Sequence, residues 1–411
     1  MKSPQLYKEA LVAALLVIAV DFLLSFVPWK FELIKPIKQG FNDFNVYDLR
    51  YSGTDTLVTT KDTGITLLEI GNTRREIAEE LNRIAAFHPR IVGIDAIFNQ
   101  PGNPADPTAH STDSALIAAL NKLPHLVLAA QYSVDSSREW MRTSFFQPKV
   151  PAARDGFFNF VEGPEDIKRH FTPFLAVNEP ANPSNPALTS RPYPSMTTQM
   201  LEILDSNAYQ TLQNRNNPVE TINYAGNLNH FNVVSLDHLF HPIKEEDAGS
   251  YFRDKIVFIG FFKAEKPDVL EDMHFTPMNE RRGGKSFPDT YGVVIHANIL
   301  EMMLGHRYID VLPAWSVYAG TLVIIFFINI FYIRRVAGGH SHNHFLLFLL
   351  QFILAIGLLY VALVIFDWFN IALDPMPLLI AVVLSFEIFW LYEWLAVKMN
   401  KLFGYATFVH D

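Results

Sequence analysis

Four apolar runs, each long enough to cross a lipid bilayer, constrain this chain of 411 residues more than any other feature. The first run covers residues 8–29, and the other three cover residues 314–333, 345–366 and 377–397. The hydrocarbon core of a bilayer is about 30 Å thick and requires about 20 mostly apolar residues of helix, which each run supplies. The first run has no small-x-small cleavage site, so we interpret it as an uncleaved anchor and not as a signal peptide. The sequence therefore predicts an α-helical transmembrane bundle of four helices.

Basic residues next to these runs predict the orientation of the chain. They are Lys2, Lys8, Arg334, Arg335, Lys398 and Lys401. Because cytoplasmic ends and loops carry an excess of lysine and arginine, both termini and the loop 334–344 are expected in the cytoplasm. The segment 30–312 and the loop 367–376 are therefore expected on the extracytoplasmic side.

The segment between the first two runs has the mixed composition of a globular domain. We predict a transmembrane anchor over residues 1–29, an extracytoplasmic domain over 30–312, three transmembrane helices over 313–397 and a short cytoplasmic tail over 398–411. The formal net charge of −9, without a basic stripe, argues against a nucleic-acid partner. Because the sequence contains no cysteine, we expect neither disulfides nor thiolate chemistry.

Within the outer segment, short runs rich in isoleucine and valine alternate with stretches of helical periodicity. The pattern predicts strands at residues 65–70, 91–98, 126–131, 220–224 and 255–260. It predicts helices at residues 74–87, 113–120, 197–204 and 293–304, and a surface loop at residues 179–194, where proline and asparagine cluster. Strands that alternate with helices are typical of βαβ units, so we expect an α/β domain with a mostly parallel or mixed sheet.

Five runs of the outer segment carry a family resemblance. They are YDLRY (47–51), IVGIDAIF (91–98), INYAG (222–226), FRDKIVFIG (252–260) and YGVVIHANILEMML (291–304). In order and spacing they resemble the type-2 CHASE domain, an extracellular sensory module with one membrane helix before it and three after it. The resemblance implies a protein of the bacterial inner (cytoplasmic) membrane whose outer domain binds a small ligand or an envelope component.

The same family commonly continues into a cytoplasmic cyclase, kinase or phosphatase domain. Here only residues 398–411 follow the fourth apolar run, so we expect no output domain in this chain. The output is then expected to pass through a membrane or cytoplasmic partner protein, through a homo-oligomer, or through movement of the helices within the lipid bilayer.

Five polar side chains of the outer segment are the candidate ligand-binding residues. They are Asp95, Asp268, Asp272, His274 and His296. Asp95 sits where a predicted parallel strand ends, at the edge where open α/β sheets bind ligands. Carboxylate and imidazole groups could bind a polar ligand or a divalent metal; alternatively, they only satisfy neighbouring polar groups inside the fold. The spacing of residues 268–274 is not that of a helical H-E-x-x-H motif, and we predict neither a metal nor a cofactor.

Two acidic residues, Asp21 and Glu387, fall near the middle of apolar runs. A carboxylate at such a depth is costly and is often functional. The two residues could lie at similar depth and share a proton, bind a basic residue of a partner, or form a proton path. Alternatively, they form a protonated pair that holds two helices together.

The predicted cytoplasmic loop carries three alternating histidines, His340, His342 and His344. They could ligate zinc or nickel, or the loop is a flexible turn without a metal. The sequence contains no G-x-S-x-G elbow, Gly-rich phosphate loop or kinase motif set, so we do not expect an enzyme.

Taken as a whole, the sequence predicts an integral membrane sensor that acts through helix movement and a partner. The alternative is a structural or ion-coupled subunit of a cell-envelope complex that uses the outer domain for docking.

Overall fold

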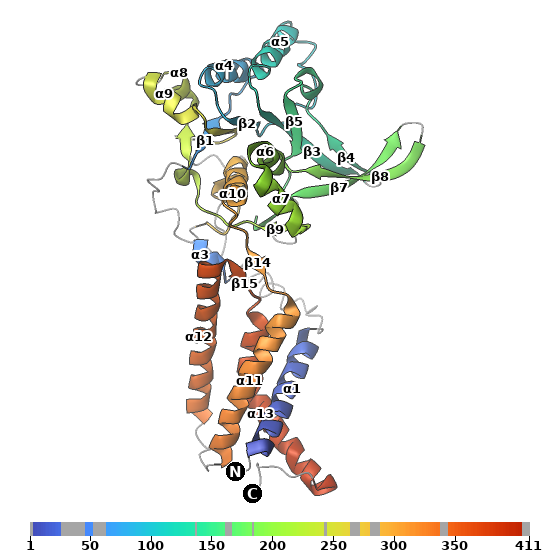
Figure 1. Cartoon of the computed structure of the whole chain (residues 1–411), viewed down its shortest axis with the longest axis vertical. Coiled ribbons are helices and arrows are strands. Elements are labelled where there is room, and N and C mark those ends of the chain that lie inside the picture. The colour runs from blue at the N-terminus through green and yellow to red at the C-terminus, as the bar shows by residue number, and fades with distance from the viewer. Residues whose placement is uncertain are drawn as a thin grey trace. The chain divides into compact units, whose positions relative to one another are not determined.

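The computed structural model describes residues 3–25, 46–51, 63–135, 138–160, 167–182, 185–241, 245–263, 272–279, 288–337 and 344–404. The chain forms two compact units. One unit is Gly40–Ile309, which contains the sheet, and the other consists of Met1–Gln39 and Asp310–Asp411, which contain the long apolar helices (Figure 1).

The unit Gly40–Ile309 is built on a seven-stranded sheet in the order β10-β1-β11-β2-β3-β4, in which β5 also pairs with β3. All neighbouring strands are parallel except β3 and β4. The strands are β1 (Ile65–Glu69), β2 (Ile91–Ile94), β3 (Leu126–Asp135), β4 (Arg138–Arg142), β5 (Ala153–Phe157), β10 (Asn232–Val234) and β11 (Ile256–Gly260). The predicted α/β fold with a mostly parallel sheet is confirmed, and β11 lies between the two strands of the predicted βαβ unit.

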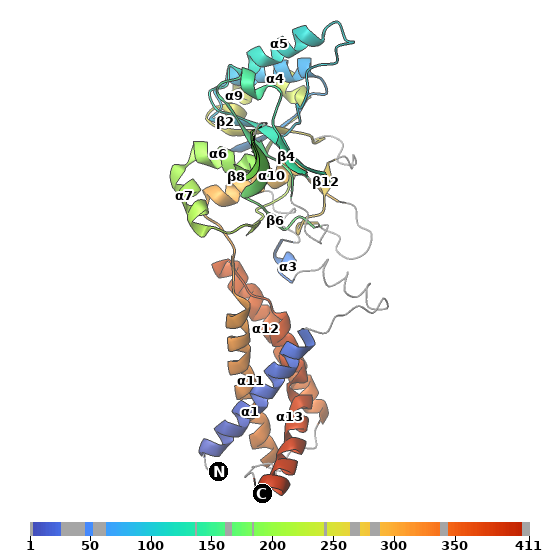
Figure 2. The same cartoon turned by 90° about the vertical axis from the view of Figure 1, so that its right-hand side faces the viewer.

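Helices cover both faces of this sheet (Figures 1 and 2). One face carries α4 (Arg74–Ala85), α5 (Ala109–Leu120), α8 (Leu236–Phe240) and α9 (Glu245–Phe252). The other face carries α6 (Met196–Leu204) and α10 (Gly292–Leu304), and α7 (Ser206–Arg215) packs against both of these helices. Because both faces are covered, every residue of β1, β2 and β11 is buried, which explains why these strands are nearly continuous apolar runs.

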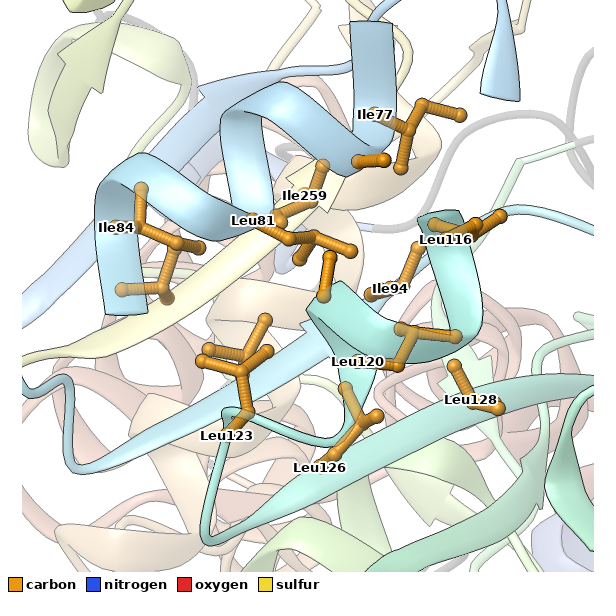
Figure 3. Packing of buried hydrophobic residues seen from close by; sticks show 14 of the residues in the cluster. Ile77, Leu81, Ile84, Ile94, Leu116, Leu120, Leu123, Leu126, Leu128 and Ile259 are labelled. Carbon is orange, nitrogen blue, oxygen red and sulfur yellow. The ribbon is translucent and has the colours of Figure 1, made fainter. Parts of the chain in front are cut away.

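An apolar core joins the sheet to α4 and α5 (Figure 3). Ile77, Leu81 and Ile84 form one stripe of α4, at the spacing from which the helix was predicted. They pack over Ile94 of β2 and Ile259 of β11. The helical periodicity of residues 74–87 thus marks the face that binds α4 to the sheet.

The predicted surface loop at residues 179–194 is wrong, because the chain forms an antiparallel hairpin there. Its strands are β7 (Phe174–Asn182) and β8 (Asn185–Pro194). Proline cannot donate a hydrogen bond to a sheet, but a two-stranded ribbon leaves one side of each strand without a partner, where Pro180 and Pro192 are tolerated. The proline content therefore indicated a loop where two edge strands are present.

The remaining elements of this unit are short. They are α3 (Asp48–Tyr51), η3 (Gln147–Lys149), β6 (His170–Phe171), β9 (Glu220–Thr221), η4 (Leu228–His230), β12 (Met273–His274) and β13 (Thr290–Tyr291). Strand β6 pairs with β9, and β12 pairs with β13, each in the antiparallel sense. The strand predicted at residues 220–224 is therefore present only as the two residues of β9.

Three described helices are long and apolar enough to cross a membrane, α11 (Ala314–Ala337), α12 (His344–Phe369) and α13 (Met376–Phe403). They confirm three of the four predicted transmembrane helices. The first apolar run also forms a helix, α1 (Ser3–Ser25), but Lys8, Glu9 and Asp21 interrupt its apolar sequence. Its role as a membrane anchor stays a prediction.

Helix α1 packs against α11 and α13 through small residues. Ala10, Ala13 and Ala14 are fully buried there, as expected where membrane helices approach closely. Helix α12 is joined to α13 by Gln351, whose Nε2 donates to the Val382 carbonyl oxygen at 3.1 Å. Two short parallel strands, β14 (Asp310–Val311) and β15 (Ile371–Ala372), connect the start of α11 to the end of α12.

We expect Gly156→Ala to destabilise the unit that contains the sheet. A Cβ atom at residue 156 would lie 2.5 Å from Met196 Cα and 2.6 Å from its backbone nitrogen, so β5 and α6 would have to separate. Overpacking of this kind costs about 1–3 kcal/mol. Hydrogen exchange of the sheet strands in the detergent-solubilised full chain measures the loss.

The matched control is Gly249→Ala in α9, where the nearest atom would be 3.6 Å away. Alanine favours a helix over glycine by up to about 1 kcal/mol, so this variant should be as stable as the original chain or slightly more stable. Equal exchange rates in the two variants would contradict the packing described for β5 and α6.

Candidate functional site

Asp95 lies at the carboxyl edge of the sheet, directly after β2, and its side chain is 8% exposed. Alternate residues of a strand point to the same face, so Asp95 shares the face of Gly93, which packs on α6. On the neighbouring strand β11, Gly260 permits a close approach of α10, because a Cβ atom there would lie 2.8 Å from Val293 Cβ. The absence of that side chain brings α10 up to Asp95.

His296 projects from α10 toward Asp95, with 4.0 Å between His296 Nε2 and Asp95 Oδ2. Its side chain is 5% exposed, and neither ring nitrogen makes a well-aligned hydrogen bond within the described part of the chain, although the Phe158 backbone interacts with the ring. Phe160, which follows β5, stacks on the imidazole with ring centroids 4.7 Å apart and planes 22° apart. Buried imidazoles normally have a hydrogen-bond partner, so His296 is an exception that requires an explanation.

The β12-β13 hairpin brings two more predicted residues to the same place. Asp272 precedes β12, and its backbone oxygen accepts the Gly292 N–H at the start of α10, at 3.2 Å. Asp272 Oδ1 lies 3.5 Å from His274 Nε2, and both side chains are partly exposed. The His274 ring also meets Phe160 edge to face, at 5.3 Å. We define Asp95, Asp272, His274, His296 and Phe160 as the carboxyl-edge site.

Burial sets the protonation of the two innermost groups. Burial, together with the smaller effect of the Asp272 carboxylate, raises the pKa of Asp95 to about 7. Burial also lowers the pKa of His296 to about 4, an effect that His274 supports and that Asp272 and the Phe158 backbone oppose. Near neutral pH, His296 is therefore uncharged and Asp95 is close to half protonated. The two groups do not form an ion pair with each other, and both can hydrogen-bond to a ligand.

Other acidic groups lie along the same edge of the sheet. Glu69, the last residue of β1, pairs with Lys263 after β11, with 2.7 Å between Glu69 Oε1 and Lys263 Nζ. Glu80 of α4 is fully buried beside Gly71, and burial raises its pKa to about 8. The edge is therefore acidic, and Lys263 is engaged by Glu69.

Asn298, one helical half-turn after His296, has its hydrogen bonds satisfied. Its Oδ1 accepts the Ala225 N–H at 2.7 Å, and its Nδ2 donates to the Gly226 carbonyl oxygen at 2.9 Å. Asn298 thus fixes α10 against the segment that follows β9. Both residues lie in the run YGVVIHANILEMML, which carries the family resemblance, but the sequence predicts no role for Asn298.

The far end of α10 belongs to a polar network around Arg307. Glu301 pairs with Arg307 at 3.2 Å and with His230 of η4 at 2.9 Å. Asn223 Nδ2 donates to the Arg307 carbonyl oxygen at 3.0 Å, and Tyr51 Oη of α3 donates to Asn223 Oδ1 at 3.3 Å. The network joins the first described helix of this unit to the segment that leaves it.

A buried ion pair fixes α3 in turn. Arg169 Nη2 and Nε donate to Asp48 Oδ2 and Oδ1 at 2.7 and 3.1 Å, and both side chains are 5% exposed. Loss of one partner of such a pair costs about 3–5 kcal/mol, because the other charge stays buried. Asp48 lies in the run YDLRY, which carried the resemblance but was assigned no role.

The structure brings together four of the five predicted ligand-binding residues, Asp95, Asp272, His274 and His296. Asp268 lies outside the described residues. Within the ranges that the structure describes, no three His, Asp or Glu side chains are arranged to hold a metal ion. Phe160 was not predicted, because it follows a strand that the apolar pattern did not indicate.

The two acids of the apolar helices lie apart. Asp21 is buried in α1 and is close enough to Asp374 to interact with it electrostatically. Glu387 is exposed on α13, about 16 Å along the helix axis from Met376. The depth of either acid in a bilayer stays a prediction. Of the loop histidines, His340 and His342 lie outside the described residues, and His344 is the first residue of α12.

We expect Asp95→Asn to stabilise the protein at pH 8. The raised pKa of Asp95 means that folding is penalised as the pH rises from about 4 to 7, and the penalty stays constant above pH 7. One pKa unit corresponds to about 1.4 kcal/mol, so the asparagine variant should gain about 4 kcal/mol at pH 8 and almost nothing at pH 4. Thermal unfolding of the full chain in detergent, at both pH values, measures the difference.

The control for this variant is Asp272→Asn, whose side chain is 41% exposed and should have a small effect at either pH. An asparagine variant at residue 95 that is no more stable than the original chain at pH 8 would contradict the description of this buried carboxyl.

Comparison with known proteins gives a family for this arrangement. A family model described as the CHASE2 domain matches residues 13–331, which is most of the chain. No curated protein matches the chain, and no solved structure does. The family match, the mostly parallel sheet and the apolar helices agree with the resemblance of the five sequence runs. The chain therefore belongs to the CHASE2 domain family.

Proposed function

We propose that the chain is a bacterial envelope sensor whose unit Gly40–Ile309 binds a small ligand or envelope component outside the cytoplasmic membrane. The CHASE2 family consists of extracellular sensory domains, and three helices of the chain are long and apolar enough to span a membrane. The proposal places the ligand at the carboxyl-edge site. It assigns no catalytic step to the residues of that site.

The observation that carries the proposal is the position of α10. One end of this helix presents His296 to the carboxyl-edge site, where its ring has no well-aligned hydrogen bond among the described residues. The other end contacts Arg307 through Glu301, shortly before the chain continues into α11. One buried helix therefore connects the candidate binding site to the segment that leads to the membrane helices.

Signal transmission in this proposal is a displacement of α10. A ligand that bonds to His296 changes the preferred position of the helix, and Glu301 passes the change to Arg307 and the chain after it. Shifts of about 1–2 Å at packed helices are a known form of switching. The output then passes through a partner protein, or through a second copy of the chain.

Charged and aromatic residues support the proposed orientation, with both termini in the cytoplasm. Arg334 and Arg335 lie in the last turn of α11, and Lys398 and Lys401 lie near the end of α13. Trp315, at the opposite end of α11, is 73% exposed, as is typical of the aromatic belt at a membrane surface.

Ligand sensing is tested on the full chain in lipid nanodiscs, with low-molecular-weight fractions of envelope extract and spent culture medium as probes. We expect one fraction to slow hydrogen exchange in α10 and to alter exchange in the first turns of α11. If no fraction changes the exchange of either helix, ligand sensing by this unit is rejected.

The alternative, a docking subunit of an envelope complex, is distinguished by purification in mild detergent. A stoichiometric partner that stays bound without any added fraction, together with unchanged exchange in α10, would favour that alternative. A homo-oligomer whose α11 exchange responds to a fraction would favour the sensor.

We expect Glu301→Gln to separate binding from transmission. Glutamine keeps the shape of the side chain but removes the charge that pairs with Arg307 and His230. The active fraction should still protect residues near His296, whereas the change in α11 exchange should fall by at least half. Hydrogen exchange of the full chain in nanodiscs measures both effects.

Glu202→Gln is the matched control, because it removes the exposed ion pair of Glu202 with Arg154, which involves no residue of α10. It should leave both effects unchanged. If the Glu301 variant transmits as well as this control, the contact with Arg307 is not the route of the signal.

A further inference from the structure

Among the described residues, the carboxyl-edge site has no compensating positive charge. Asp95 interacts electrostatically with Asp272, and the charged or titratable groups near His296 are Asp272 and His274. Lys263, on the same sheet edge, is paired with Glu69. Within the described ranges, no lysine or arginine forms an ion pair with Asp95 or Asp272.

The geometry places two hydrogen-bond acceptors at a distance that one donor can bridge. Asp95 Oδ2 and His296 Nε2 are 4.0 Å apart, which is too long for a hydrogen bond between them. A single nitrogen placed about 2.8 Å from each atom would donate to both. His296 is 5% exposed, and among the described residues its ring interacts with the Phe158 backbone but has no well-aligned hydrogen bond, so a donor near Nε2 would complete its hydrogen bonding.

We propose that the carboxyl-edge site binds the ammonium group of a small organic amine, with Asp95 and His296 as acceptors and Phe160 as the apolar wall. The inference rests on the proposed sensor function, because it names the ligand class of the same site. An ammonium group carries only donors, whereas a carboxylate and a neutral imidazole offer the matching acceptors. Charge-assisted hydrogen bonds of this kind are stronger than those between neutral groups.

Two other ligand classes fit less well. An anion would meet the carboxylate of Asp272 and would oppose ionisation of Asp95. A metal ion requires at least three converging ligands, and the described residues contain no such group of His, Asp and Glu side chains. The Phe160 ring covers one face of His296 and suits the carbon chain of an amine.

Binding of an ammonium group requires an ionised Asp95 and therefore depends on pH. The pKa of Asp95 is about 7 in the free site, so binding below pH 7 releases a proton. The apparent affinity should then fall about tenfold for each pH unit below 7. His296, with a pKa of about 4, stays an acceptor over this range.

The ligand class is tested on the full chain in detergent with three probes of equal chain length, 1,4-diaminobutane, 1,4-butanediol and succinate. We expect the diamine alone to raise the unfolding temperature at pH 8, with a much smaller rise at pH 6. Asp95→Asn should abolish the effect of the diamine. Stabilisation by butanediol or succinate to the same extent would overturn the proposal.

A second test supplies the ammonium group from the chain itself and does not depend on the size of the natural ligand. His296→Lys places an amine next to Asp95, and His296→Met is the apolar control of similar length. At pH 8 the lysine variant should unfold at a higher temperature than the methionine variant, and Asp95→Asn should remove the difference. A lysine variant that unfolds at the lower temperature would overturn the proposal, whatever the diamine does.

A metal site gives a different result in the same assay. Stabilisation by Zn²⁺ or Mn²⁺ that His274→Ala abolishes would overturn the proposal in favour of a metal ligand. The outcomes also separate this inference from the sensor function. If the lysine variant behaves as expected but no extract changes α11, the ammonium site stands and the sensor function fails.

Discussion

Burial of α10 is the constraint on which the rest of this architecture depends. Eleven of its thirteen residues are buried, so its polar side chains must find partners inside the protein. Asn298 finds them in backbone groups of residues 225–226, and Glu301 finds them in His230 and Arg307. His296 interacts with the Phe158 backbone but has no well-aligned hydrogen bond among the described residues. The α10 side chain with incomplete hydrogen bonding, His296, is therefore the one that faces the carboxyl edge of the sheet, where α/β proteins bind ligands.

Much of this fold could be predicted because its strongest signals are local. Buried parallel strands are short apolar runs, and α4 shows its core face in the spacing of Ile77, Leu81 and Ile84. The three long apolar helices follow from length and composition alone. The predictions failed where pairing between distant segments decides the structure. Nothing near β2 indicates that β11 lies beside it, and the prolines of β8 concealed a hairpin.

The candidate site shows the same division between local and distant information. Asp95 could be predicted because it follows an apolar strand, and His296 because it lies in a helix of the family pattern. Their approach to 4.0 Å depends on Gly260, which permits α10 to pack closely on β11. Phe160 arrives from β5, a strand with charged residues whose position is fixed by pairing with β3. No spacing within the sequence connects Phe160 to His296.

The unsatisfied groups of the site also determine how strongly a ligand can act. A buried polar group without a hydrogen bond costs about 1–3 kcal/mol, and both ring nitrogens of His296 lack a well-aligned hydrogen bond among the described residues. A ligand that satisfies them recovers this free energy only in the arrangement of α10 that presents them correctly. Each 1.4 kcal/mol of such a difference shifts the balance between two arrangements about tenfold. Replacing the buried polar side chain of His296 by an apolar one would therefore make the domain more stable and, at the same time, less responsive to a ligand.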